Sequence, residues 1–321
     1  MSTENKPELY LLFSVDIIDS TSRKYGNSNE SWFLNIRQFY DEFSQLFYVN
    51  YTSFNAEKTG TIKDSENFIN VWKLVGDEIL FYVNIENIEE ALTLIYSFAK
   101  TICSYNKHNK TGSNNNKKPL TVKGSIWTAQ VPFIDRVYKS KQIDFVGPSV
   151  DCGFRIGKLS DQNKIAVSME IASICLQDNE NKFLSSKTDK FILSFGKMEF
   201  LKGVFKGETE YPVFFITSKE NLHIHEKDLK SLTNKKQINK FLFSFYKYLQ
   251  TKSIKDSISP LTFPISEYLA SKNQLSEQII KKDKTKVPEI ELHGKIQNPE
   301  KMISKTKKGS KLFDTLDAKL K

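Results

Sequence analysis

The chain has 321 residues, of which 39% are hydrophobic and 26% charged, and its formal net charge is +9. This length can bury a sizeable core, and the composition is that of an ordinary globular protein rather than a disordered or fibrous one. No apolar run approaches the roughly 18 residues of a membrane-spanning helix, and the N-terminal segment MSTENKPE lacks the charged start and apolar block of a signal peptide. We therefore expect a cytoplasmic protein.

Most of the net positive charge lies at the end of the chain. Residues 281–321 hold twelve lysines against six Asp and Glu. Such a tail is typical of a solvated segment rather than of a nucleic-acid reader, since it has few aromatic residues to stack on bases. We expect no stable nucleic-acid or membrane partner.

The three cysteines, Cys103, Cys152 and Cys175, are widely spaced and form no CxxC pair. An odd number without that spacing suggests neither a disulfide framework nor a zinc site. We expect reduced thiols.

The chain begins with a buried strand, a long helix and a hairpin. The apolar run from Leu9 to Val15 ends at Asp16, where the polar segment DIIDSTS begins. Apolar side chains then recur at helical spacing between residues 32 and 47, which indicates an amphipathic helix. The segment VWKLVGDEILFYV has two apolar runs on either side of Gly76, which indicates a hairpin with Asp77 at its turn.

A second amphipathic helix follows at residues 88–105 and is ended by the polar loop NKHNKTGSNNNKK. We then expect a strand in LTVKGSIWTAQVPF, a helix opening near GPSVDCGFRIGK, a strand and a helix in IAVSMEIASICL, and a hairpin in MEFLKGVFKGETEYPVFFI. The β-α-β-β-α-β order predicts an α+β fold of the ferredoxin-like type.

Beyond residue 216 the sequence becomes lysine-rich, with KFLFSFYKYLQ as an apolar-faced helix. We place a domain boundary near residue 217. This gives a first domain at 1–217 and an accessory helical region with a basic tail at 218–321.

Asp16 and Asp77 both stand where an apolar strand ends. Two carboxylates in this setting predict a metal site, because Mg²⁺ commonly takes one or two protein carboxylates and leaves room for substrate phosphates. Asp77 alone would also suit a turn. We interpret Glu78 as a turn carboxylate, and His223 and His225 as surface residues rather than metal ligands.

Over residues 8–216 the sequence resembles the class III nucleotidyl cyclases, with several motifs in the family's order. VDIIDST is similar to the first metal motif and KLVGDE to the second. The resemblance implies two divalent ions, Mn²⁺ or Mg²⁺, held by Asp16, the carbonyl of Ile17 and Asp77. It also implies that the turn after the first motif offers backbone N–H groups to the triphosphate from Asp19, Ser20 and Thr21.

DFVGPSVDCGFR is similar to the segment that selects the base and stabilises the transition state in this family. The resemblance implies that Arg155 meets the charge developing on the α-phosphate, the task that a positioned guanidinium performs in phosphoryl transfer. It implies that Lys202 in LKGVFKG binds the triphosphate, with Lys206 as the alternative. Lys73 and Asp144 stand at the family's base-reading positions.

One difference narrows the resemblance to a bacterial branch. Where adenylate cyclases have an Asn that orients ribose and phosphate, this chain has Asp151, and GPSVDxGFR resembles the pyrimidine cyclases of the Pycsar antiphage systems. That branch makes a cyclic mononucleotide from UTP or CTP, and a separate effector senses it during infection. A lysine and an acid can also meet a uracil or cytosine edge, so Lys73 and Asp144 leave the base open.

The family shares each site across a dimer, with metal ligands from one subunit and Lys73, Asp144 and Arg155 from the other. Because this chain carries both halves, we expect a two-fold homodimer with two equivalent sites. Two alternatives stand beside a pyrimidine cyclase. One is an adenylate cyclase that makes cAMP, and the other is an inactive cyclase fold kept as a binding module.

Overall fold

The structure is a computed structural model of the chain. It describes residues 9–26, 29–59, 69–111, 120–129, 133–134, 143–178, 191–204, 210–218 and 233–256. These residues all belong to one compact unit, Met1–Leu275. Lys206, His223, His225 and the lysine-rich tail lie outside the described residues, so what we expect of them stays a prediction.

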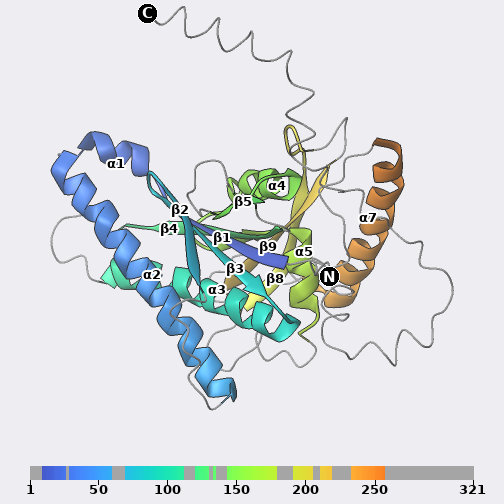
Figure 1. Cartoon of the computed structure of the whole chain (residues 1–321), viewed down its shortest axis with the longest axis horizontal. Helices are drawn as coiled ribbons and strands as arrows, with labels where there is room; N and C mark the ends of the chain where they lie inside the picture. The colour runs from blue at the N-terminus through green and yellow to red at the C-terminus, as the bar shows by residue number, and fades with distance from the viewer. Residues whose placement is uncertain are drawn as a thin grey trace, which may run out of the picture. The chain divides into compact units, whose positions relative to one another are not determined.

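A seven-stranded sheet runs through the centre of the described residues (Figure 1). Its strand order is β2-β3-β1-β4-β7-β9-β8, and all neighbours are antiparallel except β4 and β7. The strands are β1 (Leu9–Ile17), β2 (Asn70–Val75), β3 (Glu78–Ile85), β4 (Val122–Ala129), β7 (Lys164–Val167), β8 (Phe191–Glu199) and β9 (Tyr211–Ser218). A second sheet contains only β5 (Phe133–Ile134) and β6 (Ile143–Asp144).

The helices complete the predicted connectivity. They are α1 (Ser20–Gly26), α2 (Asn29–Thr59), α3 (Ile88–Thr111), α4 (Pro148–Gly157), α5 (Met169–Leu176) and α7 (Lys235–Asp256). With α2 after β1 and α3 after β3, the first four strands form a βαββαβ unit with the order β2-β3-β1-β4. The predicted α+β, ferredoxin-like fold is therefore confirmed.

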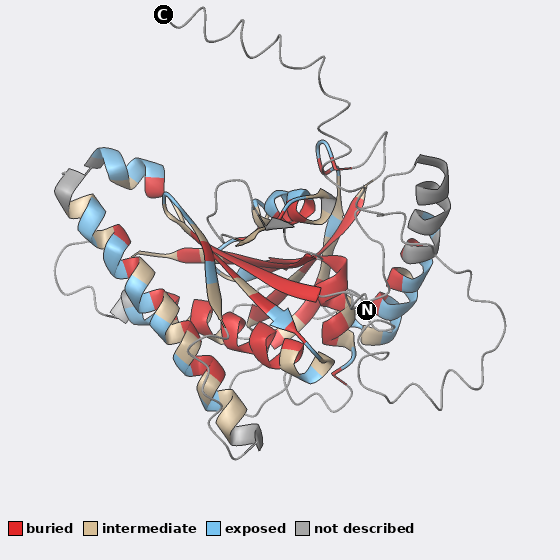
Figure 2. Cartoon of the chain, in the orientation of Figure 1, coloured by how far each residue is buried: buried red, intermediate tan, exposed pale blue. Residues whose placement is uncertain are grey.

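Helices α2 and α3 cover one face of the sheet, and α4 lies on the other (Figure 1). Phe13 of β1 packs against Phe47 of α2 and Phe98 of α3, so these helices share one face. On the other face, Trp127 of β4 packs against α4, where its ring is 5.4 Å from that of Phe154. Figure 2 shows the buried residues concentrated along the strands and on the inward sides of the helices.

The alternation of side chains along a strand decides which residues meet α4. Ser14 and Asp16 are an odd number of positions from Phe13, so they lie on the opposite face of β1 from α2 and α3. The same alternation in β4 turns Gly124 toward Phe98 of α3 and Ser125 toward α4. The α4 face of the sheet therefore carries Asp16, the single charged residue of β1, together with Ser14.

The structure differs from the sequence-based expectation in three short elements. Residues 20–26 form helix α1 rather than only a turn, and the β5–β6 pair was not expected. The final hairpin begins at Phe191, and residues 202–204 lie in a turn after β8 rather than in a strand. Phe191 and Leu193 are buried, so the part of the strand that packs into the core already begins at residue 191.

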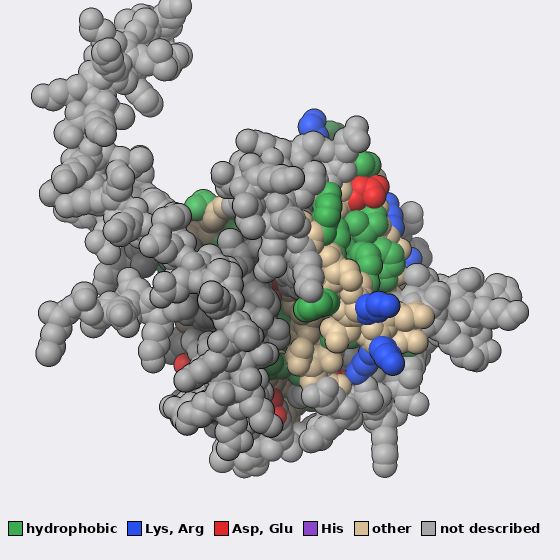
Figure 3. Space-filling model, turned by 90° about the vertical axis from the view of Figure 1, so that its right-hand side faces the viewer, with side chains coloured by type: hydrophobic (Ala, Val, Ile, Leu, Met, Phe, Trp, Pro, Cys, Tyr) green, Lys and Arg blue, Asp and Glu red, His purple; other side chains and the backbone are tan. Residues whose placement is uncertain are grey.

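The segment KFLFSFYKYLQ lies within α7, as predicted. Ile238, Leu242 and Phe245 of this helix are buried, and Phe241 packs 5.2 Å from Phe195 of β8. Figure 3 shows the side of the molecule on which α7 lies, with Lys and Arg side chains beside hydrophobic ones. The proposed boundary near residue 217 stays a prediction.

Two further expectations concern the chain as a whole. All three cysteines are reduced thiols, as expected, and Cys152 and Cys175 are buried. Among the helices of the described residues, none has the length and apolar character that crossing a bilayer requires.

Candidate active site

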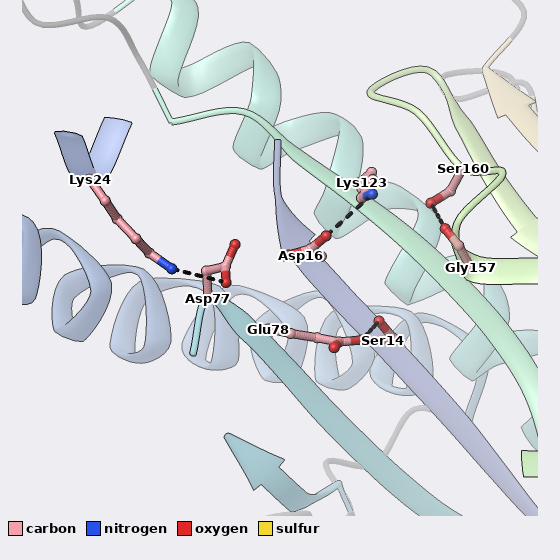
Figure 4. Close-up of polar contacts among 8 residues, drawn as sticks. All are labelled: Ser14, Asp16, Lys24, Asp77, Glu78, Lys123, Gly157 and Ser160. Atoms are coloured by element: carbon pink, nitrogen blue, oxygen red, sulfur yellow. Dashed lines mark hydrogen bonds and ion pairs between the residues drawn. The ribbon is translucent and has the colours of Figure 1, made fainter. Parts of the chain in front are cut away.

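The ends of β1 and of the β2–β3 hairpin bring Asp16 and Asp77 together (Figure 4). The backbone N–H of Ile17 donates to the carbonyl of Asp77 over 3.3 Å. The two carboxyl groups also interact electrostatically, since the charge of Asp77 helps to raise the pKa of Asp16. Both residues predicted from strand ends to be metal ligands therefore lie side by side, and Ile17 joins their backbones.

The hairpin turn is held by its glycine and by α2. Gly76 has φ +66°, in the left-handed region that glycine adopts without strain, and this places Asp77 at the tip. The hydroxyl of Tyr40 in α2 donates to the carbonyl of Gly76. Burial, followed by the charge of Asp77, raises the pKa of Tyr40, so its hydroxyl stays a donor at neutral pH.

Two lysines compensate the carboxylates. Lys123 of β4 lies directly opposite Asp16 in the antiparallel register, and its Nζ is 3.3 Å from Oδ2 of Asp16. Lys24 of α1 has its Nζ 3.7 Å from Oδ1 of Asp77. Sequence reasoning missed both residues. A single lysine inside the apolar strand VKGSIWTA is the signal that could have pointed to Lys123.

A third carboxylate, Glu78, belongs to the same cluster. It is the first residue of β3, pairs with Asp16 across the sheet, and accepts a 2.5 Å hydrogen bond from the hydroxyl of Ser14. Glu78 therefore faces the α4 side of the sheet with Asp16. The sequence-based interpretation of Glu78 as a turn carboxylate is incomplete, because its side chain belongs to the carboxylate cluster.

Burial and mutual repulsion make this cluster a place for positive charge. Burial raises the pKa of Asp16, Lys123 opposes that rise, and the charge of Asp77 adds to it. Burial also raises the pKa of Glu78; the Ser14 hydrogen bond opposes the rise, and the charges of Asp16 and Asp77 add to it. Carboxylates held close together in this way are stabilised by a proton or by a bound cation.

A cavity of about 190 Å³ adjoins the cluster on the α4 face. Acidic residues and lysines lie together in its wall, and the end of α4 closes one side. The lining residues are Ser14, Asp16, Glu78, Lys123, Gly124, Ser125, Phe154, Gly157, Lys158 and Ser160. Ser160 donates to the carbonyl of Gly157 over 2.5 Å, which holds the chain at the end of α4 (Figure 4). The cavity therefore combines the carboxylates with two lysines that suit an anionic ligand.

The two residues predicted to read the base meet each other. Lys73 of β2 and Asp144 of β6 are 71 positions apart, yet Nζ of Lys73 is 2.7 Å from Oδ1 of Asp144. Each side chain is a little more than one third exposed. The structure thus forms a donor and an acceptor side by side at the surface, although the sequence gives no short-range sign of the contact.

Other predicted residues remain apart in the single chain. Asp151 and Arg155 are exposed on α4, and Lys202 is exposed in the turn after β8. Within the described residues, the side chains of these three make no ion pair or hydrogen bond. Their predicted roles stay predictions.

The turn predicted to meet the triphosphate has an unusual backbone. Asp19 has φ +57°, and its carbonyl accepts from the N–H of Arg23 and from the hydroxyl of Ser22. Ser20 and Thr21 open α1; Ser20 is buried and Thr21 exposed. Asp19 to Thr21 therefore directly follow the strand that carries Asp16, although their contact with a triphosphate stays a prediction.

The donor set fits a hard divalent cation that shares its ligands with a substrate. In the part of the chain that the structure describes, no three His, Cys, Asp or Glu side chains meet as a group that could hold a metal ion. Asp16 and Asp77 supply two carboxylates, which is the usual protein share for Mg²⁺ bound with substrate phosphates and waters. The pair suits such an ion only together with a ligand rich in oxygen.

Comparisons with known proteins give cyclases among solved structures. No family model and no curated protein matches the sequence. The adenylyl cyclase CyaB from P. aeruginosa is 17% identical, with 68% of this chain and 96% of that one covered and a TM-score of 0.45. Adenylate cyclases from Trypanosoma brucei are 14% identical, with 68% of this chain and 92% of that one covered and a TM-score of 0.42. The guanylate cyclase domain of RhGC from Catenaria anguillulae is 14% identical, with 66% of this chain and 97% of that one covered and a TM-score of 0.39. At these low values, a function for this chain has to come from the residues of its own site.

Proposed function

We propose that the chain is a nucleotidyl cyclase that converts a pyrimidine nucleoside triphosphate, UTP or CTP, into its 3′,5′-cyclic mononucleotide and pyrophosphate. The observation that carries this proposal is the meeting of Asp16 and Asp77 from two separate strand ends, beside a cavity that Lys123 also lines. Acidic residues that hold a cation next to a lysine are the means by which proteins bind and activate a triphosphate.

In this proposal Asp16 and Asp77 hold two divalent ions, Mn²⁺ or Mg²⁺, with the carbonyl of Ile17 as a further ligand. When bound, such ions lower the pKa of the ribose 3′-hydroxyl and neutralise triphosphate charge. The chain's own contribution is to keep the two carboxylates together. It does so with the Ile17–Asp77 backbone hydrogen bond and with the Tyr40 hydroxyl on the hairpin turn.

The reaction forms one bond and breaks one. The 3′-oxygen attacks the α-phosphorus in line and loses its proton to solvent, while the bond from that phosphorus to the bridging oxygen breaks and pyrophosphate leaves. Lys123 and Lys202 would bind the triphosphate, and Arg155 would meet the charge that develops on the α-phosphate. Placed cations of this kind carry much of the barrier reduction in phosphoryl transfer.

The ion pair of Lys73 with Asp144 would read the base. Its ammonium can donate to O4 of uracil or N3 of cytosine, while its carboxylate can accept from N3–H of uracil or the amino group of cytosine. Asp151 would stand beside the nucleotide, where adenylate cyclases carry an Asn. This difference, within a segment that resembles the Pycsar cyclases, favours a pyrimidine substrate.

We further propose that the enzyme works in the cytoplasm as a homodimer with two shared sites. The metal carboxylates of one copy would face Lys73, Asp144 and Arg155 of the second copy. The described lining of the cavity beside Asp16 contains none of these three residues, which supports a site completed by a second chain.

The product would act as a second messenger that a separate effector senses in antiphage defence. The resemblance of GPSVDxGFR to the Pycsar cyclases motivates this part of the proposal. It predicts that the cyclic pyrimidine nucleotide accumulates in phage-infected cells that express the chain and not in cells that express Asp77→Asn. An equal nucleotide level before and after infection would contradict the antiphage role.

Pyrophosphate release tests the proposed activity. The purified protein is incubated with Mn²⁺ and each of the four nucleoside triphosphates in turn, and we expect the fastest release from UTP or CTP. Asp16→Asn and Asp77→Asn should each lower the rate on the order of a thousandfold, because each removes a carboxylate that holds the ions. The control Asp41→Asn, an exposed carboxylate on α2, should keep the wild-type rate.

The same assay separates the alternatives. Fastest release from ATP would indicate an adenylate cyclase instead. No release from any of the four triphosphates by a folded, Mn²⁺-loaded protein would indicate an inactive binding module and contradict catalysis.

A further inference from the structure

The contact between Lys73 and Asp144 depends on an irregularity in β2. In the pairing of β2 with β3, Val71 lies opposite Phe81 and Lys73 opposite Leu80, so Trp72 is an extra residue that forms a bulge. Neighbouring side chains in a regular strand point to opposite faces of the sheet. A bulge removes this constraint and can turn two successive side chains toward the same place.

Trp72 and Lys73 do reach the same atom. The indole Nε1–H of Trp72 donates to Oδ1 of Asp144 over 3.1 Å, and Nζ of Lys73 lies 2.7 Å from this oxygen. The backbone N–H of Phe145 is a third donor to Oδ1, at 2.9 Å. Within the described residues no donor reaches Oδ2, so this oxygen keeps its lone pairs for a ligand.

Trp72 also joins the three segments that carry the predicted substrate residues. Its ring lies 4.8 Å from Nζ of Lys73, packs edge-on 5.2 Å from Phe145, and lies 6.3 Å from Phe154. Phe145 follows Asp144, and Phe154 precedes Arg155. Trp72 is only 7% exposed, so it fixes these segments from beneath and leaves the surface to Lys73 and Asp144.

We propose that Trp72 is a positioning residue for base selection: through the β2 bulge, its indole holds Oδ1 of Asp144 so that Oδ2 accepts from the donor on the base edge. This rests on the function proposed above. A carboxylate with one oxygen fixed by three donors has lost its freedom to rotate. A fixed acceptor discriminates between base edges better than a rotating one, because the wrong edge leaves it unpaired.

The test compares Trp72→Phe with a matched control in the full-length chain. Phe keeps an aromatic ring and removes the indole N–H. The control is Trp127→Phe, because Trp127 is also buried and packs near Phe154, while its Nε1 has no hydrogen-bond partner among the described residues. Both changes cost ring volume, and only the first removes a hydrogen bond to Asp144.

Two quantities are measured for each protein. One is kcat/KM for UTP, CTP, ATP and GTP with Mn²⁺, and the other is the Kd of a non-hydrolysable α,β-methylene analogue of each. We expect Trp72→Phe to lower the ratio between the preferred and next-best nucleotide by about tenfold in both quantities, the size expected for a lost hydrogen bond to a charged group. Trp127→Phe should keep the wild-type ratio.

The outcomes separate this inference from the proposed function. If the wild type discriminates between the analogues in binding, Trp72→Phe loses this discrimination, and no nucleotide gives a product, the role of Trp72 is upheld and the proposed cyclase activity is overturned. Product formation with an unchanged base ratio in Trp72→Phe would overturn the inference alone. A wild-type protein that binds all four analogues equally, or binds none, would overturn the inference as well.

A second variant covers the case in which Trp72→Phe does not fold. Replacing Trp72 by 3-benzothienylalanine keeps the shape of the indole and exchanges the N–H for sulfur. The same tenfold loss of base discrimination is expected, and retention of the wild-type ratio would contradict the role of the hydrogen bond.

Discussion

At the scale of single residues, the candidate site is a balance between three carboxylates and the lysines beside them. Asp16 and Asp77 could be predicted because each ends an apolar run, and strand ends are visible in a sequence. Lys123 could not, because its place opposite Asp16 depends on the register of β1 with β4. The contact of Trp72 with Asp144 was equally hidden, since it requires a bulge and a strand pair far away in the chain.

Lys123→Met tests the cation that faces Asp16. Methionine keeps much of the side-chain volume and removes the charge, so Asp16 and Glu78 lose the positive group that compensates them. If Lys123 also contacts the triphosphate, its removal should lower kcat/KM at least about tenfold. The rate is measured with Mn²⁺ and the preferred nucleotide.

Lys164→Met is the matched control for this experiment. Lys164 lies on the neighbouring β7, is exposed, and faces Asp161 at 3.9 Å. Its loss should leave kcat/KM unchanged, since exposed ion pairs contribute little. Equal rates for Lys123→Met and the wild type would show that the cavity beside Asp16 does not bind the triphosphate.

At the scale of elements, periodicity predicted the long helices and the β2–β3 hairpin because each carries its own apolar pattern. The short elements escaped for a physical reason. Strands β5 and β6 have two residues each, so their pairing depends on tertiary contacts rather than on local propensity. Asp144 lies in β6, so its ion pair with Lys73 could be seen only in the folded chain.

The packing of α4 on β4 depends on Gly153. A Cβ there would meet the ring of Trp127 at 2.2 Å, so Gly153→Ala must push α4 away from the sheet. We expect a loss of about 2 kcal/mol in the free energy of unfolding, as for other overpacked cores. Urea unfolding measures it, and activity should fall as well because Arg155 moves with the helix.

Gly157→Ala, in the same helix, provides the comparison. Its Cβ would meet Ser125 Oγ at 2.8 Å, and that hydroxyl can rotate away. We expect less than about half of the Gly153→Ala loss in the free energy of unfolding. Equal losses for the two variants would contradict the packing of Trp127 on Gly153.

Glu170 makes the stability of this region depend on pH. Burial raises its pKa to about 7 from the ordinary 4.5, against opposing hydrogen bonds from Ser168 and Tyr211. Because the folded state holds the proton more tightly, the contribution of Glu170 is greatest below about pH 4.5 and is lost as the pH rises to about 7. The unfolding free energy of the wild type should therefore fall with rising pH.

Glu170→Gln removes this titration and should flatten the dependence. The difference between wild type and variant should change by on the order of 3 kcal/mol between about pH 4.5 and 8. Urea unfolding at intervals of pH measures it. Parallel curves for the two proteins would show that Glu170 does not titrate with a raised pKa in the folded state.

At the scale of the whole molecule, the two halves of the proposed site stay apart within one chain. Asp16 lines the cavity and Asp77 lies beside Asp16, whereas Arg155 is exposed on α4 and the Lys73–Asp144 pair does not line that cavity. The sequence predicted both sets of residues through their motifs. It could not show their separation, because only the folded sheet reveals which residues share a cavity.

Mixing inactive chains tests the shared site. Asp77→Ala and Arg155→Ala should each be inactive alone, and equal amounts allowed to exchange should recover about a quarter of wild-type activity. That fraction follows because half of the dimers are mixed and each mixed dimer has one intact site. If mixed dimers form by size and mass analysis and no activity returns, the site is not shared between chains.

The most direct measurement of the central claim is the identity of the product. The wild-type chain is incubated with Mn²⁺ and an equal mixture of UTP, CTP, ATP and GTP, and the products are separated and identified by mass spectrometry, with Asp77→Asn in parallel. We predict a 3′,5′-cyclic pyrimidine mononucleotide as the main product, dependent on Mn²⁺ and absent from Asp77→Asn. A main product of cAMP or cGMP, or a cyclic product that Asp77→Asn also makes, would contradict the account.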